Sequence, residues 1–436
     1  MSALQKAVKC LLLVAVAAGA QESWEAGLSD SDPRKRIRAT RELAAAENGF
    51  RHVALLAPLL QDDSEEVRAA AIVALIRVRS IDAQPLLIGA TEDPSPRVQS
   101  LAVDGLVDFY MPGYVKLGRV ASITSFGSSL RDRFSKPNPV VLAAYVEVNP
   151  EVIGAIGEVL RNGRSDECRA NAARAIGILQ GRGALDALRS GIRSRNSTII
   201  LESVLAAKKL RDQSIGPDIV FLLRDLDPKV REAVIVTVGQ LRTPEAVPDL
   251  VEIIRTSDRE QTRVQALVSL AKIPNNGQRD LFLTFLSHSN KSLRAAAAEG
   301  VGRLGTDGDE RLIDAQLVNE KATSVKLSLA FAAVTLGNLV RLDLLVEGLK
   351  SRFHRLEARP FLVEVSRNPE VLKRLYVPLA TGSEPQRRHL AYVLSQSGDE
   401  ESLSHLRNLT EDRNDEVAAA AIEAQRVLQA RLSPGA

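Results

Sequence analysis

The residues best suited to bind a ligand lie in one stretch of the chain, between positions 109 and 136. Tyr110 and Tyr114 are two of the five tyrosines of the chain, and four cations follow them: Lys116, Arg119, Arg131 and Arg133. Aromatic rings beside cations suit a binding lip or a lid, because rings offer apolar contact and cations pair with anions. We expect these six residues to contact a partner. The alternative is a degenerate repeat whose aromatic residues pack inward.

Other arrangements that could carry chemistry are weak. Gly300, Gly302 and Gly305 have the Gly-x-Gly-x-x-Gly spacing of a dinucleotide-binding turn, but they end a helical pattern instead of following a strand. We interpret Gly302 and Gly305 as close-packing and helix-ending residues. The five histidines are far apart, and none forms a His-Glu or His-x-x-x-His pair. We therefore expect no metal site, no cofactor and no catalytic residue.

A phrase recurs about every 31 residues along most of the chain. Its clearest copy, 227–241, reads Asp-Pro-Lys-Val-Arg-Glu-Ala-Val-Ile-Val-Thr-Val-Gly-Gln-Leu, with Val230 as its anchor. The corresponding anchors are Ile37, Val67, Val98, Cys168, Ile200, Arg263, Leu293, Val325, Leu356, Gln386 and Val417. A fixed period of this length is typical of stacked supersecondary units.

Each period contains two helical halves. In 246–255 the apolar residues fall at helical spacing, and Pro248 stands in the first turn, where its missing N–H is tolerated. The second half, such as 230–241, is apolar around most of its circumference. Apolar residues make up 45% of the chain and aromatics only 4%, without a clear strand pattern. We predict an all-α fold, an α-solenoid (superhelix) of about 12–13 two-helix repeats with one irregular insertion.

The phrase Asp-x-x-Val-Arg-x-x-Ala, followed by Leu-Gly or its equivalent, resembles the short bacterial HEAT repeat, also called the PBS-lyase HEAT-like repeat. The resemblance covers roughly 30–110 and 150–430. It implies ladders between turn aspartates and helix arginines, here Asp63 with Arg68 and Asp227 with Arg231. We expect interruptions where the pattern lapses, at Cys168-Arg169, Ile200-Leu201 and Gln386-Arg387. Repeats of this kind indicate a fold and not a function.

The first 20 residues have the features of a secretory signal. Lys6 and Lys9 precede an apolar run, which ends in the small-x-small sequence Ala18-Gly19-Ala20. The alternative is a first amphipathic helix. We expect a signal peptide (1–20), N-terminal repeats (21–110), an irregular insertion or degenerate repeat (111–150), and C-terminal repeats with a cap (151–436). Because a signal directs export and no apolar run is long enough to span a bilayer, we expect an exported, periplasmic protein.

The charge balance and the repeats together favour a binding protein. The formal net charge is +3, and cleavage would also remove Lys6 and Lys9, so we expect no general nucleic-acid binding. We predict a non-catalytic scaffold that binds a protein or peptide partner along the groove of the solenoid. Two alternatives stay open: a small-ligand-binding or lyase-like enzymatic protein that uses 109–136, and a cytoplasmic assembly adaptor if the N-terminus is not cleaved. The oligomeric state is not predicted.

Overall fold

The computed structural model describes residues 24–46, 48–115, 134, 138–143, 145–273, 276–306 and 308–433. Within these ranges the regular elements are α-helices and short 3-10 helices, and there is no strand, so the all-α prediction is confirmed. In this part of the chain, no helix combines the length and the apolar character needed to cross a membrane. The expected signal peptide, 1–20, lies outside the described residues.

The helices group by their contacts into two units, which are described separately. The first comprises 1–142 and 148–210, and the second comprises 143–147 and 211–436. The elements of the first unit are α2 (Pro33–Ala45), η1 (Gly49–Leu56), η2 (Pro58–Gln61), α3 (Glu65–Val78), α4 (Ala83–Ala90), α5 (Pro96–Tyr110), α7 (Pro150–Asn162), α8 (Asp166–Ile178), η4 (Arg182–Ala184), α9 (Leu185–Ile192) and α10 (Ser197–Leu210).

The second unit continues the same alternation of elements. Its elements are η5 (Gln213–Ile215), α11 (Gly216–Ile219), η6 (Val220–Arg224), α12 (Pro228–Gln240), η7 (Pro244–Ala246), α13 (Val247–Thr256), α14 (Glu260–Lys272), η8 (Asn276–Gln278), α15 (Arg279–Phe285), α16 (Lys291–Leu304), α17 (Asp309–Asn319), α18 (Thr323–Thr335), η9 (Leu339–Arg341), α19 (Leu342–Gly348), α20 (Arg355–Val365), α21 (Pro369–Thr381), α22 (Glu384–Ser397), α23 (Glu400–Leu409) and α24 (Asp415–Leu432).

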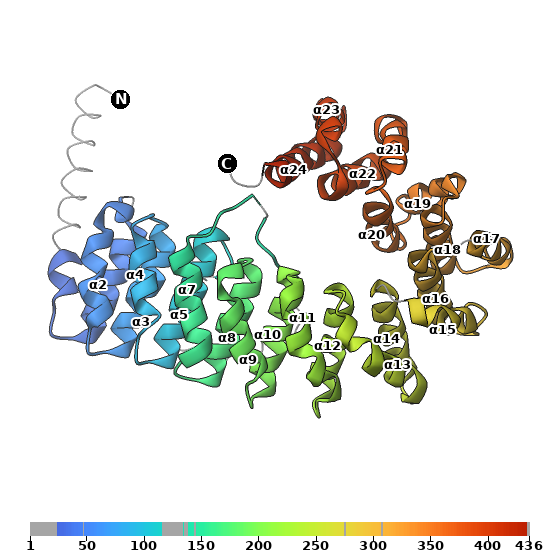
Figure 1. Ribbon diagram of the computed structural model, residues 1–436. Coiled ribbons are helices and arrows are strands. Elements are labelled where there is room, and N and C mark those ends of the chain that lie inside the picture. The colour runs from blue at the N-terminus through green and yellow to red at the C-terminus, as the bar shows by residue number, and fades with distance from the viewer. Residues whose placement is uncertain are drawn as a thin grey trace, which may run out of the picture. The chain divides into compact units, whose positions relative to one another are not determined.

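Both units are stacks of helix pairs, each with a first element and a second helix (Figure 1). The second helices pack on one another in chain order. In the first unit these are α2, α3, α5, α8 and α10, and in the second unit α12, α14, α16, α18, α20, α22 and α24. The twelve second helices among the described residues agree with the predicted number of repeats. The α-solenoid prediction is confirmed.

The two helices of a pair differ in burial, as the sequence pattern indicates. On α13 the buried residues, including Leu250 and Ile254, lie on one side of the helix. On α12 Val230 and Val234 share one side of the helix, and Ile235 on another side is buried as well. A second helix is therefore packed between neighbours. Stacking supplies the core that a single pair could not form.

The predicted anchor is buried in most repeats but not in all. Val67 and Val230 are fully buried, whereas Arg263 is half-buried and Leu356 is 70% exposed. In α20 the fully buried residue is Ala358. The turn between α19 and α20 spans 349–354 and is longer than most turns in the stack, so it moves the buried position by two residues.

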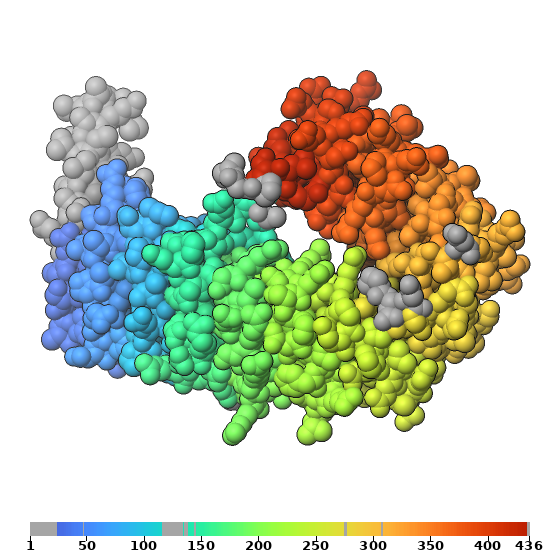
Figure 2. Space-filling view, viewed as in Figure 1, coloured from blue at the N-terminus to red at the C-terminus, as the bar shows by residue number. Residues whose placement is uncertain are grey.

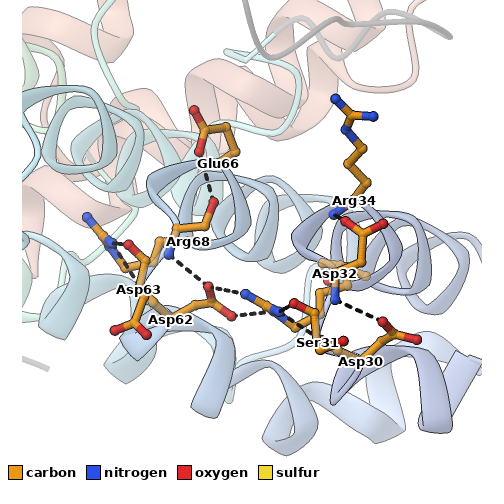
Figure 3. Close-up of polar contacts among 11 residues, drawn as sticks. Asp30, Ser31, Asp32, Arg34, Asp62, Asp63, Glu66 and Arg68 are labelled. Atoms are coloured by element: carbon orange, nitrogen blue, oxygen red, sulfur yellow. Dashed lines mark hydrogen bonds and ion pairs between the residues drawn. The ribbon is translucent and has the colours of Figure 1, made fainter.

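Arginines of the second helices tie neighbouring repeats together. The Arg36 Nε lies 2.7 Å from the Asp62 Oδ2, and the Arg68 Nε lies 2.7 Å from the Asp93 Oδ2. Arg68 also donates to the backbone carbonyls of Asp62 (2.8 Å) and Asp63 (3.3 Å), next to which it lies in Figure 3. Each of these arginines therefore bonds its own turn through carbonyls and the following turn through a carboxylate.

The ladder pairs expected from the sequence were wrong. Asp63 offers Arg68 only its backbone carbonyl. Asp227 caps α12, because its carboxylate accepts the Lys229 N–H at 2.8 Å. Arg231 donates to backbone carbonyls of its own turn. The prediction failed because the paired carboxylate comes from the next repeat, about one period further along the chain.

The interruption expected at Gln386-Arg387 was also wrong. The Arg387 Nε lies 3.1 Å from the Asp412 Oδ2, one repeat further on. Another rung joins the Arg294 Nε to the Glu320 Oε2 at 2.8 Å. The hydrogen bond from Arg294, helped by two backbone N–H groups and opposed by burial, lowers the pKa of Glu320 to about 2. Glutamate can thus take the place of aspartate as the carboxylate that pairs with an arginine of the preceding repeat.

Several second helices end in a left-handed residue. Gly305 follows α16 with φ of 59°, and Gly302 lies where an added Cβ would come 2.6 Å from the Ala332 Cα on α18. The helix-ending and close-packing interpretation of these glycines is confirmed. Arg211 and Arg242 take the same left-handed conformation, both with φ of 54°, after α10 and α12. The conformation costs a residue with a Cβ roughly 1 kcal/mol.

Cys168, the single cysteine among the described residues, packs in the core. The Cys168 side chain is buried, and its Sγ lies 2.9 Å from the Pro96 carbonyl oxygen and 3.1 Å from the Ser100 Oγ. It fills the anchor position between α5 and α8.

Candidate functional site

A hollow opens on the side of the second unit that its second helices line. In Figure 1, α14, α16, α18 and α20 lie on the inner side of the bend of this unit, and α13, α15, α17 and α19 lie on the outer side. The hollow encloses about 730 Å³, and sites for small ligands typically enclose about 300–1,000 Å³. Figure 2 shows the unit hollowed between the yellow-green surface of α12 and α14 and the orange surface of α20.

Residues at two positions of the repeat form the floor of the hollow. Gln240, Lys272 and Arg303 stand at one position on α12, α14 and α16, one repeat apart. Val268 and Glu299 stand at the other position on α14 and α16. The two positions are four residues apart, so their side chains share a helix face. Both rows therefore project into the same space.

A partly buried cluster of three charges joins α16 to α20 in this floor. Arg303 holds Glu364 with two hydrogen bonds, Nε to Oε1 at 2.7 Å and Nη2 to Oε2 at 2.9 Å, and its Nη1 lies 3.1 Å from the Glu299 Oε2. The Arg303 guanidinium also covers the Phe331 ring at 4.7 Å. A bidentate pair fixes both side chains, so this part of the floor is preorganised.

Both carboxyl groups of the cluster are committed to Arg303. Burial raises the pKa of Glu299 above its usual value, while Arg303 and Lys272 oppose the shift. Burial also acts to raise the pKa of Glu364, but hydrogen bonding and charge from Arg303, with a further charge on Arg242, hold that pKa below its usual value. The acidic side chains of the floor are thus engaged mainly by Arg303. Among the described residues, neither of them forms an ion pair with a cation of the rim.

The rim of the hollow is basic. Arg211, Arg242, Lys291 and Arg367 are exposed and line it. Within the described part of the chain, none of these four side chains has an ion pair or a hydrogen bond to a carboxylate. Cations without counter-charges around a concave surface focus a positive potential there. The hollow is therefore suited to an anionic ligand.

A smaller hollow of about 280 Å³ adjoins the rim and shares its arginines. It adds Leu356, which is 70% exposed, and Arg359, whose guanidinium lies 3.7 Å from the centroid of the Tyr392 ring. Phe353, on the turn before α20, is 83% exposed. The rim therefore offers apolar contact next to its cations, a combination frequent in interfaces between proteins.

The residues predicted from the sequence lie in the first unit or outside the described residues. Tyr110 ends α5, and its hydroxyl accepts hydrogen bonds from the Gln84 Nε2 at 2.8 Å and the Asn149 N–H at 2.9 Å. Tyr114 is half-buried just after α5. The other four lie outside the described residues: Lys116, Arg119, Arg131 and Arg133. A partner-binding role for the six stays a prediction, and the internal bonds of Tyr110 favour the packing alternative for that residue.

Sequence reasoning missed the hollow although a signal was present. Glu299 stands at a repeat position that is occupied by Val236 and Val268 in the two preceding repeats, and Arg303 lies four residues after it. An acidic residue at a position that is apolar in the neighbouring repeats, four residues before a cation, indicates a polar cluster on the inner face. Among the described residues, no three His, Cys, Asp or Glu side chains are grouped to hold a metal ion.

Comparison with known families identifies the repeats. The family described as HEAT repeats matches residues 22–107 and 193–271. These ranges hold α2 to α4 and α10 to α13 in full, and the repeat continues through the stack of both units. The chain therefore contains HEAT repeats in these two ranges, and the resemblance stated from its sequence is confirmed. No curated protein sequence matches the chain significantly.

Solved structures with detectable similarity are distant. YibA of E. coli is 14% identical, with 68% of this chain and 94% of YibA covered and a TM-score of 0.40. The CpcE–CpcF complex of phycocyanin lyase from Nostoc sp. PCC7120 is 18% identical, with coverages of 65% and 96% and a TM-score of 0.34. Kap121p bound to Pho4p is 11% identical with a TM-score of 0.41, and 94% of this chain aligns with 57% of Kap121p. These similarities transfer no ligand and no activity.

Proposed function

We propose that this chain is a non-catalytic scaffold that binds a protein partner in the hollow of the second unit. One observation carries the proposal: the hollow is open, its floor is fixed by the Arg303 cluster, and its rim has unneutralised cations. Rigid helices that present a prepared concave surface suit recognition, because little order is lost on binding.

The same geometry favours binding over catalysis. An acid–base mechanism needs a carboxyl group or a histidine free to exchange a proton with substrate. Glu299 and Glu364 are both engaged by Arg303, and the His354 Nδ1 lies 3.3 Å from the Glu357 Oε2 on the rim. The carboxyl groups and the histidine that line the hollow are therefore engaged by other side chains.

The proposal includes the export expected from residues 1–20. Intact mass measurement of the protein isolated from its native cell separates the two cases. Loss of the first 20 residues from an exported fraction supports it. A full-length cytoplasmic chain instead supports the assembly adaptor.

Site-specific photo-crosslinking in the native cell tests the scaffold role. A photoreactive amino acid replaces Ser292 or Gln240, which line the hollow, and in matched controls it replaces Glu310 or Val318, which are exposed on α17. We expect the hollow positions to yield one discrete protein adduct and the controls to yield none. Adducts of equal strength from both sets, or from neither, contradict the proposal.

A further inference from the structure

In the first unit the chain itself lies across the second helices. Residues 138–142 have no regular secondary structure, and they pass over α8 and α10. The Lys209 Nζ on α10 donates to the Val140 carbonyl oxygen at 3.0 Å, and the Leu142 N–H donates to the Ile178 carbonyl oxygen at the end of α8 at 2.8 Å. An irregular segment is thus held through its backbone by the ends of second helices.

The corresponding positions in the second unit face the open hollow. Gln240, Lys272 and Arg303 follow Lys209 in the repeat, each one period further along the chain, and all three line the hollow. Long polar side chains at this position can donate to backbone carbonyls of a crossing segment, as Lys209 does. The second unit therefore repeats the docking surface of the first, without a described segment of the chain on it.

We infer that the hollow takes an extended acidic segment of a partner protein. The inference rests on the proposed function and specifies the chemistry of the partner. Arg211, Arg242 and Arg367 bind its carboxylates, while Gln240 and Lys272 bind its backbone carbonyls. Charge complementarity favours acidic side chains, because the cations of the rim have no carboxylate partner among the described residues.

The reach of the surface sets the length of the segment. The helices α12, α14 and α16 pack side by side, and packed helices lie about 8–10 Å apart. Three helices span about 20 Å, which an extended chain crosses in about six residues at roughly 3.3 Å each. Leu356, in the adjoining smaller hollow, can then contact an apolar residue of the segment.

Fluorescence anisotropy with defined peptides tests the inference. The probe is a short labelled peptide that alternates Glu with Val and Leu, and the matched peptide carries Gln in place of Glu. We expect the Glu peptide to bind and the Gln peptide to bind at least about tenfold more weakly, with affinity falling as salt rises. A version with Pro in place of Val cannot form a helix and should still bind.

Variants of the full chain locate the binding. Arg242→Ala with Arg367→Ala removes two rim cations, and Arg311→Ala with Arg407→Ala removes two exposed cations on α17 and α23 outside the hollow. We expect the first pair to weaken Glu-peptide binding about tenfold and the control pair to leave it unchanged. Circular dichroism confirms that both fold.

Three outcomes overturn the inference. The Gln peptide binds as tightly as the Glu peptide, the Pro version fails to bind, or a single-stranded oligo-dT binds as tightly as the Glu peptide in a manner sensitive to the rim variant. In the last case the hollow is a nucleic-acid site. Photo-crosslinking at Ser292 that succeeds while the Glu peptide fails leaves the scaffold role standing and removes only the acidic partner.

Discussion

The two units carry similar charged clusters on their second helices, but the cluster is covered in the first unit and open in the second. In the first unit Arg174 on α8 holds Glu202 on α10 at 2.7 Å, and the Phe134 ring lies 4.7 Å from the Arg174 guanidinium. In the second unit Arg303 holds Glu364 at the same closest distance, but the pair lies in the floor of an open hollow. A charged cluster on the second helices is thus covered in the first unit and exposed to an open hollow in the second. A covering segment makes the difference.

The largest effect is expected from Arg303→Met in the second unit. The change leaves two partly buried carboxyl groups, Glu299 and Glu364, without the cation that they share, and it also removes the contact with Phe331. Together these losses should cost about 3 kcal/mol. Urea unfolding followed by circular dichroism measures the loss of the free energy of unfolding. The triple variant Arg303→Met, Glu299→Gln, Glu364→Gln should recover most of it, because no buried charge remains.

The pH dependence of Arg303→Met sharpens this prediction. Without Arg303 the pKa values of Glu299 and Glu364 should rise above those of the unfolded chain. Groups with raised pKa values stabilise the fold at low pH and lose that contribution as pH rises through the folded pKa. The deficit relative to wild type should therefore be larger at about pH 7 than at about pH 5. An equal deficit at both values contradicts the cluster.

A smaller loss is expected from Arg174→Met in the first unit. Glu202 stays near a second cation, Lys209, whose charge partly replaces that of Arg174. We expect a loss of about 2 kcal/mol. Hydrogen exchange of the amides of α8 and α10 reports it locally. A loss as large as that of Arg303→Met would mean that the covered and open clusters do not differ.

Lys209 should give the first unit a dependence on alkaline pH. Burial, with the charge of Arg174 adding and that of Glu202 opposing, lowers the pKa of Lys209 from its usual 10.5 to about 8. The folded state therefore disfavours the charged form, and this penalty disappears as pH rises from about 8 to about 10.5. Stability of α10 should rise by about 1 kcal/mol over that window, since partial exposure weakens the effect. In Lys209→Met the rise should be absent.

The smallest effect is expected from Phe134→Ala. The change removes the ring over Arg174 but leaves the ion pair with Glu202 intact. A cation–π contact near the surface contributes about 0.5–1 kcal/mol. Hydrogen exchange of α8 should increase slightly, while binding of the Glu peptide in the second unit should not change. Weaker peptide binding in this variant would contradict the assignment of the site to the second unit.

Much of the fold could be predicted because each repeat contacts its immediate neighbours. The period indicated the stack, and the closeness of Gly302 to Ala332 followed from a glycine at the contact between α16 and α18. The predicted partners of the arginines were wrong: the helix pattern placed Arg68 correctly, but the carboxylate that it pairs with, Asp93, belongs to the following turn. The predicted buried anchor Leu356 was also wrong, because a longer turn shifts the next helix.

The sequence by itself determined the repeating helix pair, because the spacing of apolar residues along a helix shows whether one side of it or most of its circumference is buried. The tertiary structure alone decided where the site lies. Arg303 and Glu364 are 61 residues apart, and they meet because the stack of the second unit bends across α18. Periodicity shows which helices are neighbours, but the bend and the side-chain directions decide contacts two repeats apart. They also decide whether a surface is covered.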